Sequence, residues 1–505
     1  MRLPVAKQLD IKAFSGGTIT ELEAGITNGI VQVVGEVAYV TQRPSVDVFE
    51  DAGGAGAAAK GRGIFYWPDT GSTYICNDTD IYKDTQATSI SSAITTGSAR
   101  CYWFPIGGVV IFTDPENDEA FSIATNDTVA AINDTDFPST LAHGGAYLNN
   151  AIYLLSEDGT IYGSDSGDGT SWSALNFIQA SRDPDGGVFM AKHHDSLLVF
   201  GYSTIEVYYD AANTSGSPLS RRQDVSYNIG CAFGPAVWEI GDRCFWVGVD
   251  AAGAFSVYVM EQFQVRKIST DSIDSFITQA FVKGGYTAWA SGFSAAGHDF
   301  YLLTIATGDQ LMTETTLCFD DTSGLWHIWD TTINDITQLP LVQWTKRYGS
   351  DSQFGQGVLQ NGDVISLNDN INPVDTLLGN LYVEDGASVS LNYVVDGYVQ
   401  STTGEGVNIA MSVRTGMIDG QTNKYKIPES LRFVGNRTDT AQTLTVKWSN
   451  ERNDSFNTGR TMDTSTGQKI GRLGRFQRRN HELSMTGDEQ FFLEAVELPL
   501  RVGND

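Results

Sequence analysis

The segment Ile152–Tyr162, with the sequence IYLLSEDGTIY, decides the fold of this chain. Two short apolar runs flank Asp158-Gly159, and an Asp-Gly pair supplies the positive φ angles that a tight hairpin turn requires. Similar segments recur at intervals of 46, 42, 46, 47, 56 and 56 residues. Repeats of about 40–50 residues with several short strands each are typical of propeller blades, which must stack around an axis to bury their faces. The repeat therefore predicts a β-propeller of about six or seven blades. The first apolar runs of the repeats centre on Phe65, Ile111, Tyr153, Val199, Trp246, Leu302 and Val358.

The spacing of the apolar runs changes after Asn370, and the later runs predict a separate β-sandwich-like domain. We therefore expect an all-β protein in three parts. Residues 1–50 form an N-terminal arm with one or two strands, which closes the propeller or contacts a neighbour. Residues 51–370 form the propeller, and residues 371–505 form the C-terminal β-rich domain. One short helix is expected at Thr270–Phe281, where apolar residues fall on one face.

The chain of 505 residues has 32 basic and 61 acidic side chains, a net charge of −29. Such a surface repels phosphate and disfavours ordinary nucleic-acid binding, although DNA could pass along it without adhering. The five cysteines lie far apart and form no CxxC pair, so they are interpreted as buried apolar residues. We find no apolar run long enough for a signal peptide or a membrane span.

Catalytic motifs such as HExxH, the P-loop and GxSxG do not occur, so we expect no catalytic residue, cofactor or metal. His193-His194 is a poor chelate, because neighbouring residues on a strand point to opposite faces. Ser166–Trp172 (SGDGTSW) is similar to the Asp-box hairpin of sialidase-type propellers, although it is one residue short. A single copy favours a structural hairpin over sialidase chemistry. A glycan-binding or sialidase-like propeller is the alternative function.

The segment Arg460–His481 is a basic island in an acidic chain, with six Lys and Arg against one acid. Two interpretations stay open. The arginines lie on the solvent face of a strand, or they contact an acidic neighbour or DNA. The candidate interface residues are Arg472, Arg475, Arg478 and Arg479.

About one hundred residues, Asp183–Phe281, carry a specific family resemblance. Pro184–Gly186 (PDG) is followed by Phe200–Tyr208 (FGYSTIEVY) and later by Lys267–Thr270 (KIST). This order resembles the tail nozzle proteins of short-tailed bacteriophages, also called tail hub or packaged-DNA stabilisation proteins. Ile470–Arg475 is a weaker match, and the rest of the chain agrees mainly in layout.

The resemblance implies a structural role in the phage tail, without catalysis. Such proteins form a sixfold ring below the portal and its adaptor, extend the DNA channel and help to retain the packaged genome. The implied partners are other copies in a homohexamer, the adaptor or head-to-tail connector protein, and tail fibre, spike or needle proteins. Double-stranded DNA would pass through the lumen without sequence-specific binding. The implied location is the virion, after assembly in the host cytoplasm.

Overall fold

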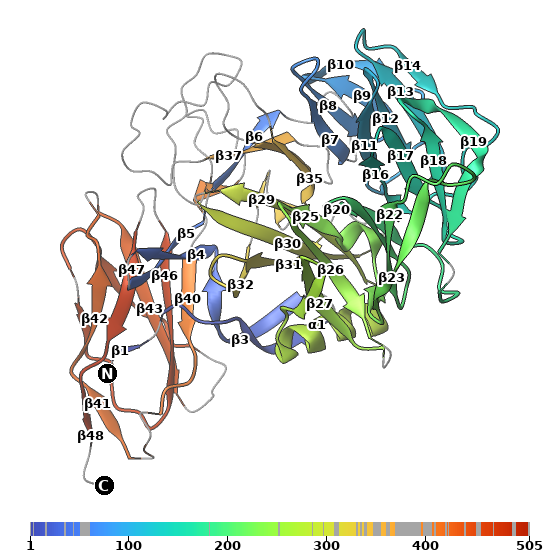
Figure 1. The fold of residues 1–505 in the computed structure, drawn as a ribbon. Helices are drawn as coiled ribbons and strands as arrows, with labels where there is room; N and C mark the ends of the chain where they lie inside the picture. Colours follow the sequence, from blue (N-terminus) through green and yellow to red (C-terminus); the bar gives the residue numbers. More distant parts are fainter. Residues whose placement is uncertain are drawn as a thin grey trace.

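The protein is described by a computed structural model in which β-strands form most of the chain and one α-helix is present in the described part. Figure 1 shows a group of radiating sheets joined to a two-sheet unit that contains both the first and the last strand. No helix in this part of the chain is long and apolar enough to cross a membrane. The structure describes residues 2–3, 5–15, 18–34, 37–43, 45–50, 61–180, 182–250, 253–284, 286–295, 297–307, 313–329, the strands that lie between 332 and 408, 411–419, 422, 424–438, 441–450, 456–467, 469–486 and 491–502.

The first four blades are antiparallel sheets in which successive strands pair in chain order. Blade 1 consists of β7 (Gly61–Trp67), β8 (Ser72–Asn77), β9 (Asp80–Lys83) and β10 (Thr85–Ser91). Blade 2 consists of β11 (Tyr102–Ile106), β12 (Val109–Asp114), β13 (Glu119–Ala124) and β14 (Val129–Ala131). Blade 3 consists of β16 (Ala146–Leu148), β17 (Ala151–Leu155), β18 (Thr160–Asp165) and β19 (Asp168–Gln179). Blade 4 consists of β20 (Phe189–His193), β21 (Ser196–Phe200), β22 (Ile205–Asp210) and β23 (Leu219–Tyr227), with β15 (His143–Gly144) parallel to β20.

Three further blades complete the described propeller. Blade 5 consists of β24 (Gly230–Cys231) and β25 (Trp238–Ile240), which both pair with β26 (Arg243–Val249), then β27 (Phe255–Glu261) and β28 (Gln264–Lys267). Blade 6 consists of β29 (Tyr286–Ala295), β30 (His298–Thr307), β31 (Thr313–Asp320) and β32 (Leu325–Ile328). Blade 7 consists of β35 (Leu341–Lys346), β36 (Gly355–Leu359), β37 (Val364–Asn368) and β6 (Ser45–Glu50). Strand β6 also pairs with β38 (Val395–Asp396), which pairs in turn with β39 (Val407–Asn408). A separate hairpin joins β33 (Thr332–Ile333) to β34 (Ile336–Thr337).

The seven predicted repeat centres fall on seven different blades, which confirms the propeller prediction. Each sheet stays open, and the ring comes from packing between neighbouring blades. The innermost strand β35 contacts both β29 and β7, so blade 7 lies between blades 6 and 1. The outer strand of blade 7 comes from the start of the chain, because β6 pairs antiparallel with β37. This pairing joins Val46 to Leu367 and Val48 to Ile365.

The second unit is a two-sheet sandwich with alternating buried and exposed residues in strands such as β40 and β42. Its core includes Val413, Phe433 and Val446, all buried. The expected boundary near residue 370 lies outside the described residues. One sheet contains β1 (Arg2–Leu3), β4 (Gly29–Val34), β5 (Val37–Gln42), β42 (Ser430–Gly435), β45 (Lys469–Gly471) and β47 (Leu493–Glu497). The facing sheet contains β2 (Asp10–Ser15), β3 (Thr18–Thr27), β40 (Met411–Thr415), β43 (Thr443–Asn450), β44 (Arg460–Asp463) and β46 (Arg479–Thr486). A small ribbon pairs β41 (Lys426–Pro428) with β48 (Leu500–Val502).

Strand β3 joins the sandwich to the propeller. It pairs with β40 on the sandwich side, and its last residue pairs parallel with Ile328 at the end of β32 in blade 6. The next residue, Asn28, donates its backbone N–H to the Ile328 carbonyl at 2.8 Å. Fully buried Arg43 donates to the Asn28 side-chain oxygen at 3.1 Å and lies 5.2 Å from the ring centre of Trp329. A continuous sheet and a buried cation therefore fix the two units to each other.

The predicted helix is α1 (Asp271–Gly284), which begins one residue later than expected. Its buried face, which includes Phe276 and Ile277, packs into the core shared by blades 5 and 6. The Thr270 hydroxyl accepts the Ile273 N–H at 3.4 Å, as an N-cap side chain does. The five cysteines are buried and unpaired, as the sequence predicts.

Candidate interface surface of the sandwich

The loop between β45 and β46 lies at one end of the sandwich, and its apolar residues hold it there. Leu473 and Phe476 are 1% and 2% exposed and belong to the sandwich core. Lys426 donates its backbone N–H to the Phe476 carbonyl at 2.7 Å, and Phe476 returns the hydrogen bond at 3.0 Å. Because Leu473 and Phe476 point inward, the polar residues between them are left on the outside of the loop.

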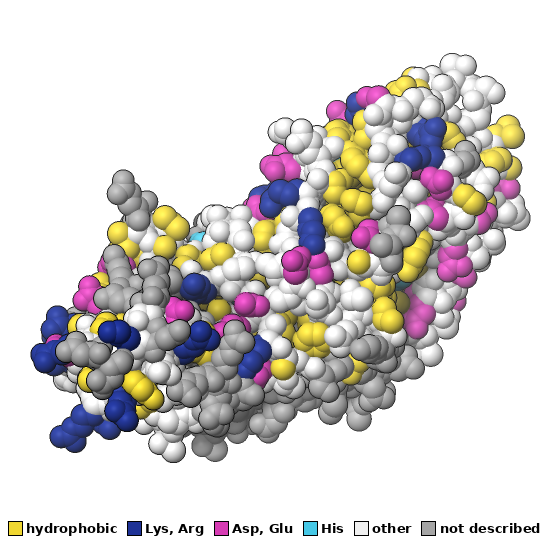
Figure 2. Space-filling model, turned by 90° about the horizontal axis from the view of Figure 1, so that it is seen from below, with side chains coloured by type: hydrophobic (Ala, Val, Ile, Leu, Met, Phe, Trp, Pro, Cys, Tyr) yellow, Lys and Arg dark blue, Asp and Glu magenta, His cyan; other side chains and the backbone are white. Residues whose placement is uncertain are grey.

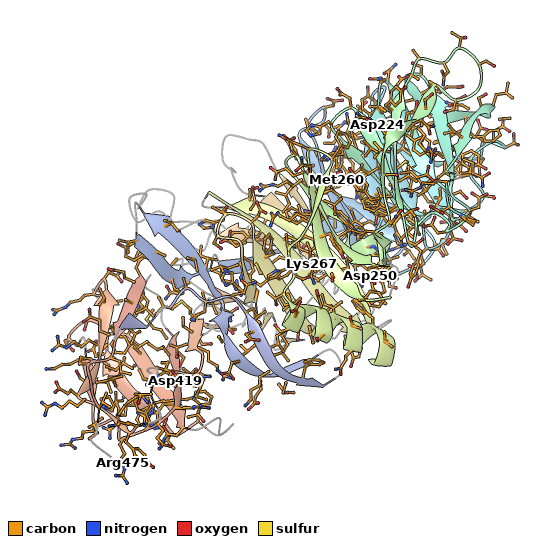
Figure 3. All side chains as sticks on the ribbon, turned by 60° about the horizontal axis from the view of Figure 1, so that its bottom comes forward. Asp224, Asp250, Met260, Lys267, Asp419 and Arg475 are labelled. Atoms are coloured by element: carbon orange, nitrogen blue, oxygen red, sulfur yellow. The ribbon has the colours of Figure 1, made fainter. Side chains whose placement is uncertain are left out.

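Three of the four predicted interface arginines lie on this exposed side: Arg472, Arg475 and Arg478. The Arg475 guanidinium lies 4.9 Å from the ring centre of Tyr425, so a cation–π contact orients it. Figure 3 shows Arg475 at the outermost tip of the sandwich, away from the propeller. The structure therefore brings these three arginines together on one surface.

Arg479 is different, because its side chain is only 1% exposed. It lies between the rings of Phe476 and Trp448, at 4.3 and 5.4 Å from their centres. It donates to the Leu473 carbonyl at 2.7 Å and to the Asn450 side-chain oxygen at 2.8 Å. Burial lowers the pKa of Arg479 to about 10, so it stays charged at neutral pH. Arg479 thus stabilises the loop from the interior of the sandwich and does not reach the surface.

The β41–β48 ribbon adds residues that lie far from the basic island in the sequence. Tyr425, Ile427 and Val502 are 37%, 51% and 52% exposed, which is unusual for apolar side chains of this size. We call the exposed side of this end of the sandwich the distal surface. Two carboxylates, Asp419 and Glu429, accompany its cations. The exposed cations of the distal surface are Lys424, Lys469, Arg472, Arg475, Arg478 and Arg501.

Charge is divided unevenly along the chain. Residues 411–505 contain 14 Lys and Arg against 12 Asp and Glu, a net charge of +2. Residues 1–410 contain 18 against 49, a net charge of −31. Lys and Arg are correspondingly denser over the sandwich than over the propeller in Figure 2, which views the molecule from below. One molecule therefore carries a basic end and a strongly acidic remainder.

The interior of the propeller ring is filled by side chains at the level of Arg100, which is 1% exposed. Arg100 lies directly before blade 2, and it donates to the Ala290 carbonyl of blade 6. Its guanidinium also lies 5.1 Å from the ring centre of Trp238 in blade 5. Burial, with a further contribution from Arg100, lowers the pKa of nearby His143 to about 4. Because blade 2 stands across the ring from blades 5 and 6, Arg100 spans the propeller axis.

The Asp-box-like segment forms the turn between β18 and β19 and the first residues of β19. The Asp168 carboxylate accepts the Thr170 N–H at 2.9 Å and the Thr170 hydroxyl at 2.6 Å, and these bonds lower the pKa of Asp168. Trp172 donates its ring N–H to the Gly169 carbonyl at 3.1 Å. The segment is also bonded to its surroundings, since Asp134 accepts the Trp172 backbone N–H at 3.1 Å, so these contacts are those of a structural turn. The described residues contain no group of three or more His, Cys, Asp or Glu that could hold a metal ion.

The comparison with solved structures gives distant alignments. Among solved structures, a virginiamycin B lyase from Staphylococcus aureus aligns at 9% identity and a TM-score of 0.41, over 65% of this chain and 99% of that one. BamB from Moraxella catarrhalis aligns at 9% and 0.35, over 67% and 96%. The designed protein Ika8 aligns at 8% and 0.34, over 68% and 96%. Likeness at this level carries no argument about fold or function, and no curated protein matches the chain.

The family comparison is more specific. The model of the phage stabilisation family, described as bacteriophage P22 Gp10, beta-propeller, matches residues 22–351. The match includes all of blades 1 to 6 and begins within β3 of the sandwich. Because it extends over well more than half of the chain, the protein belongs to the phage stabilisation family of bacteriophage P22 Gp10, and it is a structural protein of the phage tail.

Proposed function

We propose that this protein forms the nozzle ring of a short-tailed phage as a homohexamer. The ring extends the DNA channel below the portal and its adaptor, helps to retain the packaged genome, and docks distal fibre, spike or needle proteins. The protein acts as a building element and not as an enzyme. Newly made copies collect in the host cytoplasm and join the virion during tail assembly.

The observation that carries this proposal is the filled propeller axis. Arg100 reaches across the ring to Ala290 and Trp238, so a DNA duplex has no route along the axis of a single propeller. A DNA channel built from this chain must therefore run between copies. A closed ring of identical subunits provides such a channel, and head-to-tail contacts close when the rotation between subunits divides a full turn.

The acidic remainder of the chain suits the wall of such a channel. Duplex DNA carries about one negative charge per 1.7 Å of its axis, and proteins hold it mainly by neutralising phosphates with Lys and Arg. Residues 1–410 carry a net charge of −31, so their surface offers few such contacts. DNA would therefore slide past this surface without being bound.

The distal surface supplies one side of the proposed contact between copies. Arg472, Arg475 and Arg478 are exposed together, and the propeller of a neighbouring copy offers the opposite charge. Arginine and aromatic side chains are also enriched in protein interfaces, which fits the exposed Tyr425 beside Arg475. A basic end against an acidic neighbour gives a head-to-tail contact.

Electron microscopy tests the proposal in two ways. Class averages of the purified protein should show sixfold rings with one central hole between the subunits. Gold-labelled antibody should mark a single vertex of the virion, at the end of a stubby tail. Label confined to the soluble fraction with bare virions, or a purified protein that stays monomeric under all assembly conditions, would contradict the proposal.

A further inference from the structure

A groove with a volume of about 820 Å³ lies at one end of blade 4. Its formation follows from an irregular strand pair. Glu206 pairs with Ser226, but Tyr208 pairs with Arg221, so residues 222–225 leave the ladder opposite a single residue of β22. This bulge forms one wall of the groove, and Figure 3 marks its residue Asp224. The lining consists of Asn149, Asp195, Ser196, Tyr209, Asp210, Arg221, Arg222, Gln223 and Asp224.

Tyr209 provides an open aromatic surface in this groove. Its cross-strand partners are Ser196 on β21 and Ser220 on β23. Paired residues project to the same face of a sheet, and serine is too small to cover a phenol ring. Tyr209 is accordingly 41% exposed. A ligand with a flat apolar face could therefore stack on Tyr209 without displacing another large side chain.

Two polar side chains that line the groove from the other face of the sheet than Tyr209 are held in position by the protein. Glu206, which is 3% exposed, accepts from Arg221 at 3.3 Å and from the Tyr208 hydroxyl at 3.2 Å. Arg221 also donates to the Gln223 side-chain oxygen at 3.0 Å. Asp210 accepts from the Asn149 amide at 2.8 Å on the other side of the groove. The groove thus presents an ordered donor and an ordered acceptor in addition to the exposed ring.

The chemistry of these groups selects a class of ligand. The lining has three carboxylates and two guanidinium groups, so its formal charge is −1 and it disfavours anionic ligands. Carboxylates accept hydroxyl protons, and a guanidinium donates in a fixed fork to neighbouring oxygens. A pyranose ring has both required features, an apolar C–H face and an edge of hydroxyl groups. Ligand sites generally measure about 300–1,000 Å³, so this groove has room for more than one sugar ring.

We propose that the blade 4 groove binds a neutral oligosaccharide by stacking one sugar ring on Tyr209. Arg221 and Asp210 hydrogen-bond to hydroxyl groups of another ring of the same glycan. The groove holds the glycan without cleaving it. This binding is a property of one subunit and does not require the nozzle ring, so the two proposals can fail separately.

Saturation-transfer NMR on the full-length protein tests the proposal. The probes are di- to tetrasaccharides of glucose, galactose, mannose and N-acetylglucosamine, with sialyllactose as an acidic comparison. At least one neutral probe should bind. Tyr209→Ala should weaken its binding by about tenfold, since an aromatic contact is worth about 0.5–1.5 kcal/mol beyond the buried area. Tyr209→Phe keeps the stacking ring, and the proposed contact does not use the phenol hydroxyl, so binding should change by less than about threefold.

Tyr202→Ala is the matched control, because Tyr202 is another exposed tyrosine of blade 4, at 51%, and it does not line the groove. It should bind the probe as the unaltered protein does. Failure of every neutral probe to bind, tighter binding of sialyllactose, or equal binding by the Tyr209→Ala variant would overturn the proposal. Thermal unfolding establishes that each variant is folded, and electron microscopy of the same samples reports ring formation independently.

Discussion

Charge reversal of the exposed loop of the distal surface should weaken assembly without unfolding the protein. The variant carries Arg472→Glu, Arg475→Glu and Arg478→Glu. The distal surface has six exposed cations and two carboxylates, a formal charge of +4, and the three changes convert it to −2. It would then face the acidic propeller of the next copy with the same sign of charge.

The size of the effect follows from the exposure of these groups. An exposed ion pair is worth about 0.2–1 kcal/mol, so three lost pairs remove roughly 0.6–3 kcal/mol from each contact. Repulsion between like charges adds a loss of similar size. A total of about 1–6 kcal/mol weakens one contact by roughly five- to twenty-thousand-fold, since each 1.4 kcal/mol is a factor of ten. The free energy of unfolding should change little, within about 0.5 kcal/mol, as for other surface substitutions.

Sedimentation velocity across a range of protein and NaCl concentrations measures this effect. The unaltered protein should dissociate as salt rises from about 0.15 to 1 M, because the screening length falls from about 8 to 3 Å. The matched control carries Arg432→Glu, Arg437→Glu and Arg460→Glu, which are exposed in the same sandwich but outside the loop. Rings should survive in the control and disappear in the loop variant. The reasoning would be refuted if the two variants assembled equally well, or if ring formation by the unaltered protein did not depend on the NaCl concentration.

Three further predictions concern stability, each measured by urea unfolding with tryptophan fluorescence. Arg62→Met should lower the free energy of unfolding by about 3–5 kcal/mol, because it leaves the fully buried Asp114 carboxylate without its partner at 2.5 Å. The double variant that also carries Asp114→Asn should recover part of this loss, and strictly additive effects of the two substitutions would contradict the prediction. Arg479→Met should cost about 1–3 kcal/mol through its lost hydrogen bonds, and no loss would show that the loop is held by its apolar residues alone. Burial lowers the pKa of His327 to about 4 and of His481 to about 3, so between about pH 6.5 and pH 4 the unfolded chain binds more protons than the folded protein. The free energy of unfolding should therefore fall as the pH drops through this range. His481→Gln should make this pH dependence less steep, and an unchanged slope would refute the prediction.

The sequence was sufficient to predict the features that arise from neighbouring residues. Each blade depends on hairpins whose strands are adjacent in the chain, so turns such as Asp158-Gly159 mark them directly. The helix followed from its apolar spacing in the same way. The pairing of β6 with β37, or of Arg2 with Glu497, joins segments hundreds of residues apart and has no local signature. The N-terminal arm was expected to close the propeller or to contact a neighbour, but its partner strands and its contribution to the sandwich were visible only in three dimensions.

The candidate interface was likewise predictable only where it depends on residues that are neighbours in the sequence. The basic island identified the exposed loop, but it could not separate Arg478 from Arg479, because adjacent strand residues take opposite faces and the core decides which is inner. Arg501 and Ile427 join the distal surface through a ribbon that no spacing in the sequence indicates. The groove of blade 4 was missed entirely, because its walls depend on a strand bulge and on a turn from blade 3.

The outer strand of blade 7 also sets an order of events during synthesis. The ribosome makes β6 first and releases β37 more than three hundred residues later, which at about 5–20 residues per second takes roughly 15–60 s. During this interval blade 7 lacks its partner and the propeller cannot close. The sandwich is completed later still, because β1 pairs with β47 near the end of the chain. A product truncated before β37 would therefore lack both a closed propeller and a finished sandwich, whereas one truncated between β37 and β47 would lack only the finished sandwich.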